Sequence, residues 1–148
     1  MYIQVMEFNK ERNKLELDMK LELNMLREEI REFWEATTVA ERLDAFIDVE
    51  YVWIGTQIKA SYNTFAIPDE LTNSIKQSLG VMGDILAEEL GMHMSECYHK
   101  ARNIVCDCNQ MKGKDRDKEG KVIKDSHVRD ATKEIALMIE AITKPKEY

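Results

Sequence analysis

The chain has 148 residues, with 28 Asp and Glu against 21 Lys and Arg, so its formal net charge is −7. Its two prolines and six glycines are too few for the turns of an all-β sandwich or a doubly wound sheet, and this scarcity predicts an all-α fold. Such a length suffices for one hydrophobic core, so we expect a single domain over 1–148. The negative charge disfavours nucleic-acid binding but does not exclude small phosphates bridged by Mg²⁺.

The sequence also carries signals about the protein's surroundings. No stretch is long and apolar enough for a membrane span, and the N-terminus lacks the segments of a signal peptide, so we expect a cytoplasmic protein that does not bind membranes. Cys97, Cys106 and Cys108 are odd in number and crowded together, which predicts reduced thiols. Zinc binding by these thiols with His99 is the alternative, although the spacings are not those of the usual structural zinc sites.

The first half of the chain predicts two long helices. Apolar residues recur every three or four positions over 15–36, the pattern of an amphipathic helix, after a short leading helix near 5–8. Thr37 and Thr38 favour a helix cap and predict a second helix over 39–60, antiparallel to the first because the connection is short. The apolar positions expected in the core are Leu15, Met19, Leu23, Leu26, Ile30, Phe33, Leu43, Phe46, Ile47 and Ile54.

The second half predicts further helices. Residues 63–67 have the composition of a loop, and Pro68 followed by two acids is a helix start. That helix should end near residue 90, before Gly91, and Gly80 and Gly83 could interrupt it. The remaining expected elements are a helix over 92–108, an exposed loop over 111–125, a helix over 127–142 and a loose tail after residue 143.

Acidic side chains follow one face of each of the first two long helices. On the first, Glu28, Glu29 and Glu32 project from about one turn. On the second, spacings of three and four place these residues on one line: Glu41, Asp44, Asp48, Tyr51 and Gly55. Like charges at such spacings destabilise a helix by about 0.2–0.5 kcal/mol a pair, so two stripes on neighbouring helices require an explanation.

A bound divalent cation would explain both acidic stripes. Carboxylates without clustered His or Cys form a hard oxygen site suited to Mg²⁺ or Mn²⁺ rather than Zn²⁺. Mg²⁺ held in this way keeps positions open for water and phosphate, which suggests metal-assisted attack of water on a phosphoanhydride. The alternative is that the acids are the solvated faces of amphipathic helices.

The acidic pattern resembles a known family. Glu-Glu-x-x-Glu at 28–32, followed by Asp-x-x-x-Asp-x-x-Tyr-Val-x-x-Gly-Thr at 44–56, is similar to the MazG-like all-α nucleotide pyrophosphohydrolases. That family includes the dimeric dUTPases and the phage-type dCTP/dUTP pyrophosphatases. The resemblance implies a helical bundle with antiparallel metal-binding helices, hydrolysis of nucleoside triphosphates to the monophosphate and pyrophosphate, and assembly as a homodimer or homotetramer.

The resemblance also implies roles for individual acids. Glu29 and Glu32 match the family's first pair of Mg²⁺ ligands, and Asp48 matches its final Asp. The family has a Glu three positions before that Asp, where this chain has Ala45, so we assign the fourth ligand to Asp44, which shares Asp48's helix face. Catalysis would then depend on Glu29 and Glu32 together with Glu28, the candidate to orient or deprotonate the attacking water.

A basic segment far downstream carries the second resemblance. The lysine-rich, glycine-containing turn at 108–124 is similar to a segment of the phage-type branch, and 111–124 has a local charge of +3 against −10 for the remainder. The Asn109 amide can bind a base or sugar edge, while Lys112 and Lys124 can neutralise triphosphate oxygens, so the loop would close over a nucleotide. The alternative is a solvated turn.

Aromatic residues on the two acidic helices are further candidates for nucleotide contact. Tyr51 lies on the same line as Asp48, and Trp34 follows the first acidic stripe. An aromatic ring near the site could stack on a base, as could Trp53, although packing in the core is the alternative for both tryptophans.

Together these features predict a Mg²⁺-dependent nucleoside triphosphate pyrophosphohydrolase that controls a nucleotide pool, with Mn²⁺ as the alternative metal. The resemblance to the phage-type branch makes dUTP or dCTP the first substrates to test. One alternative is a non-enzymatic helical interaction or regulatory protein with acidic surface helices. Another is a housekeeping hydrolase for damaged nucleotides.

Overall fold

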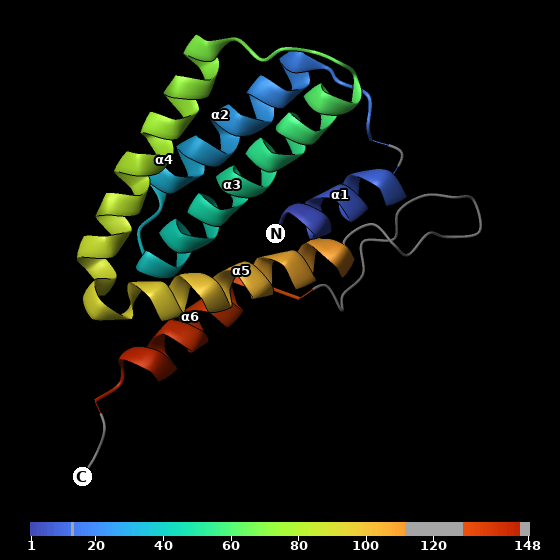
Figure 1. Ribbon diagram of the computed structural model, residues 1–148. Helices are drawn as coiled ribbons and strands as arrows, with labels where there is room; N and C mark the ends of the chain where they lie inside the picture. The colour runs from blue at the N-terminus through green and yellow to red at the C-terminus, as the bar shows by residue number, and fades with distance from the viewer. Residues whose placement is uncertain (13, 112–128, 146–148) are drawn as a thin grey trace.

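The computed structural model describes residues 1–12, 14–111 and 129–145. Within these ranges the chain is helical and contains no strand, so the all-α prediction is confirmed for the described residues. No helix among them is long and apolar enough to cross a membrane. The elements, labelled in Figure 1 except for the 3₁₀ helix η1, are α1 (Tyr2–Glu11), α2 (Met19–Glu35), α3 (Val39–Tyr62), α4 (Asp69–Leu90), η1 (Gly91–His93), α5 (Met94–Met111) and α6 (Ala131–Thr143).

The most extensive helix contact joins α2 and α3. Each begins at a capped end: the side chain of Asp18 accepts a backbone N–H from the first turn of α2, and that of Thr38 does the same for α3. Glu22, near the start of α2, bonds to Lys59, near the end of α3, so the two helices are antiparallel. The predicted antiparallel pair is therefore present (Figure 1).

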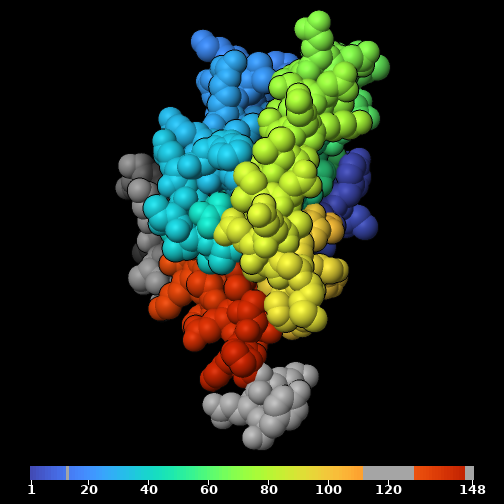
Figure 2. Space-filling model, turned by 90° about the vertical axis from the view of Figure 1, so that its left-hand side faces the viewer, coloured from blue at the N-terminus to red at the C-terminus, as the bar shows by residue number. Residues whose placement is uncertain are grey.

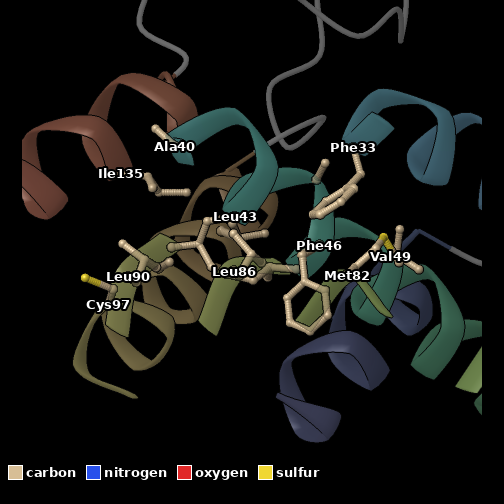
Figure 3. Close-up of a cluster of buried hydrophobic side chains, with 14 of the residues drawn as sticks. Phe33, Ala40, Leu43, Phe46, Val49, Met82, Leu86, Leu90, Cys97 and Ile135 are labelled. Atoms are coloured by element: carbon tan, nitrogen blue, oxygen red, sulfur yellow. The ribbon is translucent and has the colours of Figure 1, made fainter. Parts of the chain in front are cut away.

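The main hydrophobic core lies between α2, α3, α4, α5 and α6. Among the residues labelled in Figure 3 are Phe33 of α2, Phe46 of α3, Met82 and Leu86 of α4, and Ile135 of α6. Each large apolar side chain buried in this way contributes roughly 1.5–3 kcal/mol. Of the predicted core positions, Leu26, Phe33, Leu43, Phe46 and Ile47 are buried, while Leu15, Met19, Leu23, Ile30 and Ile54 are half-buried.

Helix α4 runs without interruption through Gly80 and Gly83, and Figure 2 shows it descending the middle of one face with α6 below. It ends at Gly91, where φ is +53°, a backbone conformation that favours glycine. The predicted stop at Gly91 is confirmed. The chain then turns through η1 into α5, which extends to Met111.

Several helix ends differ from the expectation. Helix α1 spans Tyr2–Glu11 rather than a short stretch near 5–8, and α2 starts at Met19 rather than at 15 because Asp18 provides the cap. Helix α6 starts at Ala131, after its cap Asp130, rather than at 127. Most of the loop expected over 111–125 lies outside the described residues.

Candidate functional site

Two cavities flank the antiparallel pair of α2 and α3. The larger, of about 550 Å³, is bounded by α1, α2, α3 and the end of α5, and among its lining residues are Glu29 and Asp48. The smaller, of about 300 Å³, lies where α6 meets α2 and α3, and Glu32 and Asp44 line it. The four predicted ligands therefore come from facing helices but are divided between two cavities that share no lining residue.

Glu29 lies in surroundings that disfavour its charged form. It is half-buried, and its Oε2 atom is buried with no hydrogen-bond partner among the described residues. Burial, followed by the negative charges of Glu32, Glu28 and Asp44, raises the pKa of the Glu29 carboxyl to about 7. Glu32, Glu28 and Asp44 thus lie close enough to Glu29 to disfavour its negative charge.

The two aspartates of α3 differ in their surroundings. Asp44 accepts a hydrogen bond of 2.8 Å from the Thr132 hydroxyl of α6, which ties the start of α6 to the acidic face of α3. Asp48 lies one helical turn further on, half-buried, at the wall of the larger cavity. The bond from Thr132 thus holds the Asp44 carboxylate from a third helix.

The donor chemistry of this region fits a hard divalent cation. All four side chains offer carboxylate oxygens, and the buried, unpartnered oxygen of Glu29 is the kind of group that a cation would satisfy. In the described part of the chain, no three Asp, Glu, His or Cys side chains converge closely enough to hold an ion as they stand. Closing the coordination shell would need rotation of these side chains toward one another.

Helix α1 covers the larger cavity because Gly55 allows a close approach. A Cβ atom on Gly55 would lie 3.3 Å from Nδ2 of Asn9 and 3.5 Å from a methyl group of Val5. The ring of Phe8 meets Tyr51 edge-on, with centroids 5.6 Å apart. The absence of a side chain at Gly55 thus lets α1 form a wall of the cavity.

Tyr51 is in the larger cavity's lining, as its place on the Asp48 line predicts. Its residue exposure is 6%, and its hydroxyl is buried with no partner among the described residues. Burial raises the pKa of this phenol above its ordinary range, so the hydroxyl stays protonated at neutral pH.

Asn109 lines the same cavity from the end of α5. Its backbone carbonyl accepts a 3.2 Å hydrogen bond from Arg12 Nη2, and the guanidinium of Arg12 also lies 3.9 Å from the centre of the Phe8 ring. The neighbouring Gln110 amide donates to the Gln4 carbonyl of α1. These contacts hold the last turn of α5 against α1 and bring Asn109 to the cavity.

The other predicted residues are not all brought to the cavity. Glu28 is exposed, and Trp34 is 57% exposed, packs its ring edge-on against Phe33 and is not among the residues that line either cavity. Trp53 is buried in the main core. Lys112 and Lys124 lie outside the described residues.

The larger cavity also contains a buried polar cluster that sequence reasoning missed. Lys59 Nζ donates to Glu22 Oε1 at 2.5 Å, and the Thr56 hydroxyl donates to Glu22 Oε2 at 2.7 Å. A signal for this cluster exists in the sequence, because Lys59 lies four residues beyond Gly55 and so extends the line of Asp48.

The three cysteines, all within the described residues, are buried and form no disulfide. Burial raises the pKa of the Cys97 and Cys106 thiols, which keeps both protonated and unreactive. The described residues contain no Cys and His group that could hold zinc.

Comparison of the chain with known proteins finds no match. No family model matches the chain, and no curated protein or solved structure matches it. The resemblance to the MazG-like enzymes therefore depends on the acidic spacing at 28–56 and on the segment at 108–124.

Proposed function

We propose that the protein is a Mg²⁺-dependent nucleoside triphosphate pyrophosphohydrolase of the MazG-like kind, which cleaves its substrate to the monophosphate and pyrophosphate. One observation carries the proposal. Glu29, with an unpartnered buried oxygen and a pKa raised to about 7, lines the same cavity as Asp48 and Asn109. A cavity of about 550 Å³ lined by several acids is suited to a ligand that binds together with a metal ion.

The acids of α2 and α3 would hold the cation. Glu29 and Asp48 would bind it from the larger cavity, and Glu32 and Asp44 from the smaller one. When bound, Mg²⁺ neutralises charge on phosphate oxygens and lowers the pKa of bound water, with Mn²⁺ as an alternative. Glu28, which is exposed next to Glu29, is available to take a proton from the attacking water.

The nucleoside would occupy the remainder of the larger cavity. Asn109 offers an amide at its wall, and the segment that begins at Lys112 follows directly in the chain. Lys112 and Lys124 would neutralise the triphosphate, so that a protein with a negative net charge could bind a polyphosphate substrate. The resemblance gives dUTP and dCTP as first substrates.

Pyrophosphate release from a panel of ordinary and oxidised nucleoside triphosphates tests this function. We expect Mg²⁺-dependent formation of equal amounts of monophosphate and pyrophosphate. Ordinary nucleotides should have the higher kcat/KM, whereas a preference for oxidised bases would support the housekeeping alternative. Failure to release pyrophosphate from every nucleotide would favour the non-enzymatic interaction protein.

The resemblance further leads us to propose a homodimer or homotetramer. The exposed side chains of Trp34 on α2 and Leu137 on α6, 57% and 59% exposed, are candidates for burial between subunits. Sedimentation equilibrium should give two or four times the mass of one chain. A mass equal to one chain would contradict the assembly but not the activity.

A further inference from the structure

The larger cavity contains a charged pair that is nearly sealed from solvent. Glu22 is 1% exposed, Lys59 is 7% exposed, and Thr56 is completely buried. Lys59 Nζ is 2.5 Å from Glu22 Oε1, and the Thr56 hydroxyl is 2.7 Å from Glu22 Oε2. Glu22 and Lys59 line the same cavity as Glu29 and Asp48, so the cavity has a second polar region besides the acids proposed to bind metal.

Stability alone gives no reason for this pair. Removing a carboxylate and an ammonium from water costs more than their attraction returns in many proteins, and apolar residues of similar volume are often as stable or more so. The pair also keeps unused hydrogen-bonding capacity. Within the described chain, each oxygen of Glu22 accepts one side-chain bond and Lys59 Nζ donates one of its three N–H groups.

The two polar regions of the cavity are separated along the helices. Glu22 and Glu29 are seven residues apart on α2, which corresponds to about 10 Å along the helix axis. Side chains of Met25 and Val52 line the cavity at intermediate positions on α2 and α3, and Phe8 lines it from α1. A ligand that spans the cavity therefore meets Glu29 and Asp48 at one end and apolar surface in the middle. At the other end it meets the Glu22–Lys59 pair, with Lys14, Glu16 and Asp18 also in the lining.

We propose that Glu22 and Lys59 select the nucleobase, and that they select a base with a lactam edge, in which a ring N–H lies next to a carbonyl group. The Glu22 carboxylate would accept from the ring N–H, and the Lys59 ammonium would donate to the carbonyl oxygen. Uracil, thymine and guanine carry this edge. Adenine and cytosine present an amino group beside an unprotonated ring nitrogen instead.

This inference rests on the proposed function, because that function brings a nucleotide into the cavity. It narrows the first substrates from dUTP or dCTP to dUTP, and it adds dTTP and dGTP. A site that hydrogen-bonds a specific group discriminates strongly against an analogue that lacks it, since the buried protein groups are then left unpaired.

Equilibrium binding of nucleoside monophosphates, the products of the proposed reaction, tests the inference by titration calorimetry in Mg²⁺ buffer. We expect dUMP and dGMP to bind at least about tenfold more tightly than dCMP and dAMP. The double variant Glu22→Met/Lys59→Met removes both charges while filling their space, so it should fold. In this variant the ratio of the affinities for dUMP and dGMP to those for dCMP and dAMP should fall to about one.

Two further variants complete the experiment. Arg42→Met/Glu89→Met removes the ion pair between α3 and α4, which lies outside both cavities, and should keep the full preference. Glu22→Gln keeps one acceptor oxygen, for Lys59, and replaces the other oxygen by an amide donor, so it should reduce the preference even if the double Met variant does not fold.

Three results would overturn the inference: equal affinity of the wild-type protein for all four monophosphates, no detectable binding of any of them, or an unchanged preference in the Glu22 and Lys59 variants. Binding of a monophosphate requires no hydrolysis. Pyrophosphate release without base preference would therefore contradict this inference alone, and base preference without pyrophosphate release would contradict the proposed function alone.

Discussion

Burial and neighbouring acids disfavour the ionised form of Glu29 in the folded protein. A carboxyl group with a pKa of about 7 favours the protonated form in the folded protein, whereas in the unfolded chain its pKa is near 4.5. The folded state therefore binds more protons than the unfolded state between these values, and the free energy of unfolding falls as pH rises through this window. Without a cation, Glu29 destabilises the protein at neutral and alkaline pH.

Replacing Glu29 by Gln should consequently stabilise the protein without divalent cations. At pH 8 we expect the free energy of unfolding in EDTA to increase by on the order of 1–3 kcal/mol, because the buried charge and its repulsion by Glu32 disappear. At pH 5 the gain should be small. Urea unfolding at both pH values measures the effect, and Glu88→Gln, an exposed acid on α4, is the matched control. A loss of stability at pH 8 would show that the charge of Glu29 does not destabilise the folded protein.

The single substitution Glu32→Gln tests the assignment of the metal ligands. Glu32 is exposed, so the substitution should leave the fold intact while lowering kcat/KM by about 100-fold or more, since one proposed ligand oxygen is lost. The measurement is pyrophosphate release beside the Glu88→Gln control. Unchanged turnover in Glu32→Gln would mean that the metal binds elsewhere.

The candidate site was only partly predictable from individual residues. The acids of α2 and α3 were found because charges at i, i+3 and i+4 on adjacent helices are visible in the sequence, and Tyr51 and Asn109 do line the cavity. Glu22 and Lys59 were not found, because each is a single charged residue whose burial depends on the register between two helices. That register follows from packing along their full length, which a spacing rule does not contain.

At the scale of helices, composition and periodicity predicted the number and order of the main elements, whereas local caps decided their ends. Apolar periodicity begins at Leu15, but α2 starts only after Asp18, whose side chain accepts a backbone N–H. Gly83 does not interrupt α4, and a Cβ atom there would lie 3.7 Å from the Phe46 ring, so this glycine sits at a packed contact with α3. Tertiary packing thus outweighed the low intrinsic helix propensity of glycine.

Substitution by Ala should have opposite effects on stability at two glycines, one within α4 and one at its end. Gly91→Ala forces an L residue into φ +53° and ψ −128°, which should destabilise the protein by about 1–3 kcal/mol. Gly80 lies within α4 with open space where a Cβ atom would be added, so Gly80→Ala should stabilise by about 0.5–1 kcal/mol. Urea midpoints of both variants measure these changes. A destabilised Gly80→Ala would contradict an uninterrupted α4.

For the whole molecule, the net charge of −7 hides an uneven distribution. Acids gather where α2 faces α3, whereas the segment at 111–124 has a charge of +3. A divalent cation would reverse the sign of the local potential at the acidic face, so that a polyphosphate could bind to an acidic protein.

Cation binding should therefore raise the thermal stability of the whole protein. A ligand that binds only the folded state at 100 times its Kd adds about 2.7 kcal/mol, and each kcal/mol corresponds to roughly 2–4 °C in Tm for a chain of this size. We expect Tm to rise by several degrees from EDTA to saturating Mg²⁺, as followed by circular dichroism. The shift should be much smaller in Glu29→Gln. Equal shifts in both proteins would indicate that Mg²⁺ binds outside the acidic cluster.

The proposed hydrolysis is measured most directly by ³¹P NMR of a mixture of dUTP and the four ordinary deoxynucleoside triphosphates incubated with the protein and Mg²⁺. We expect a deoxynucleoside monophosphate and pyrophosphate to appear together in equal amounts, and EDTA to stop their formation. Release of orthophosphate with a diphosphate, or no change in any triphosphate, would contradict the proposed hydrolysis.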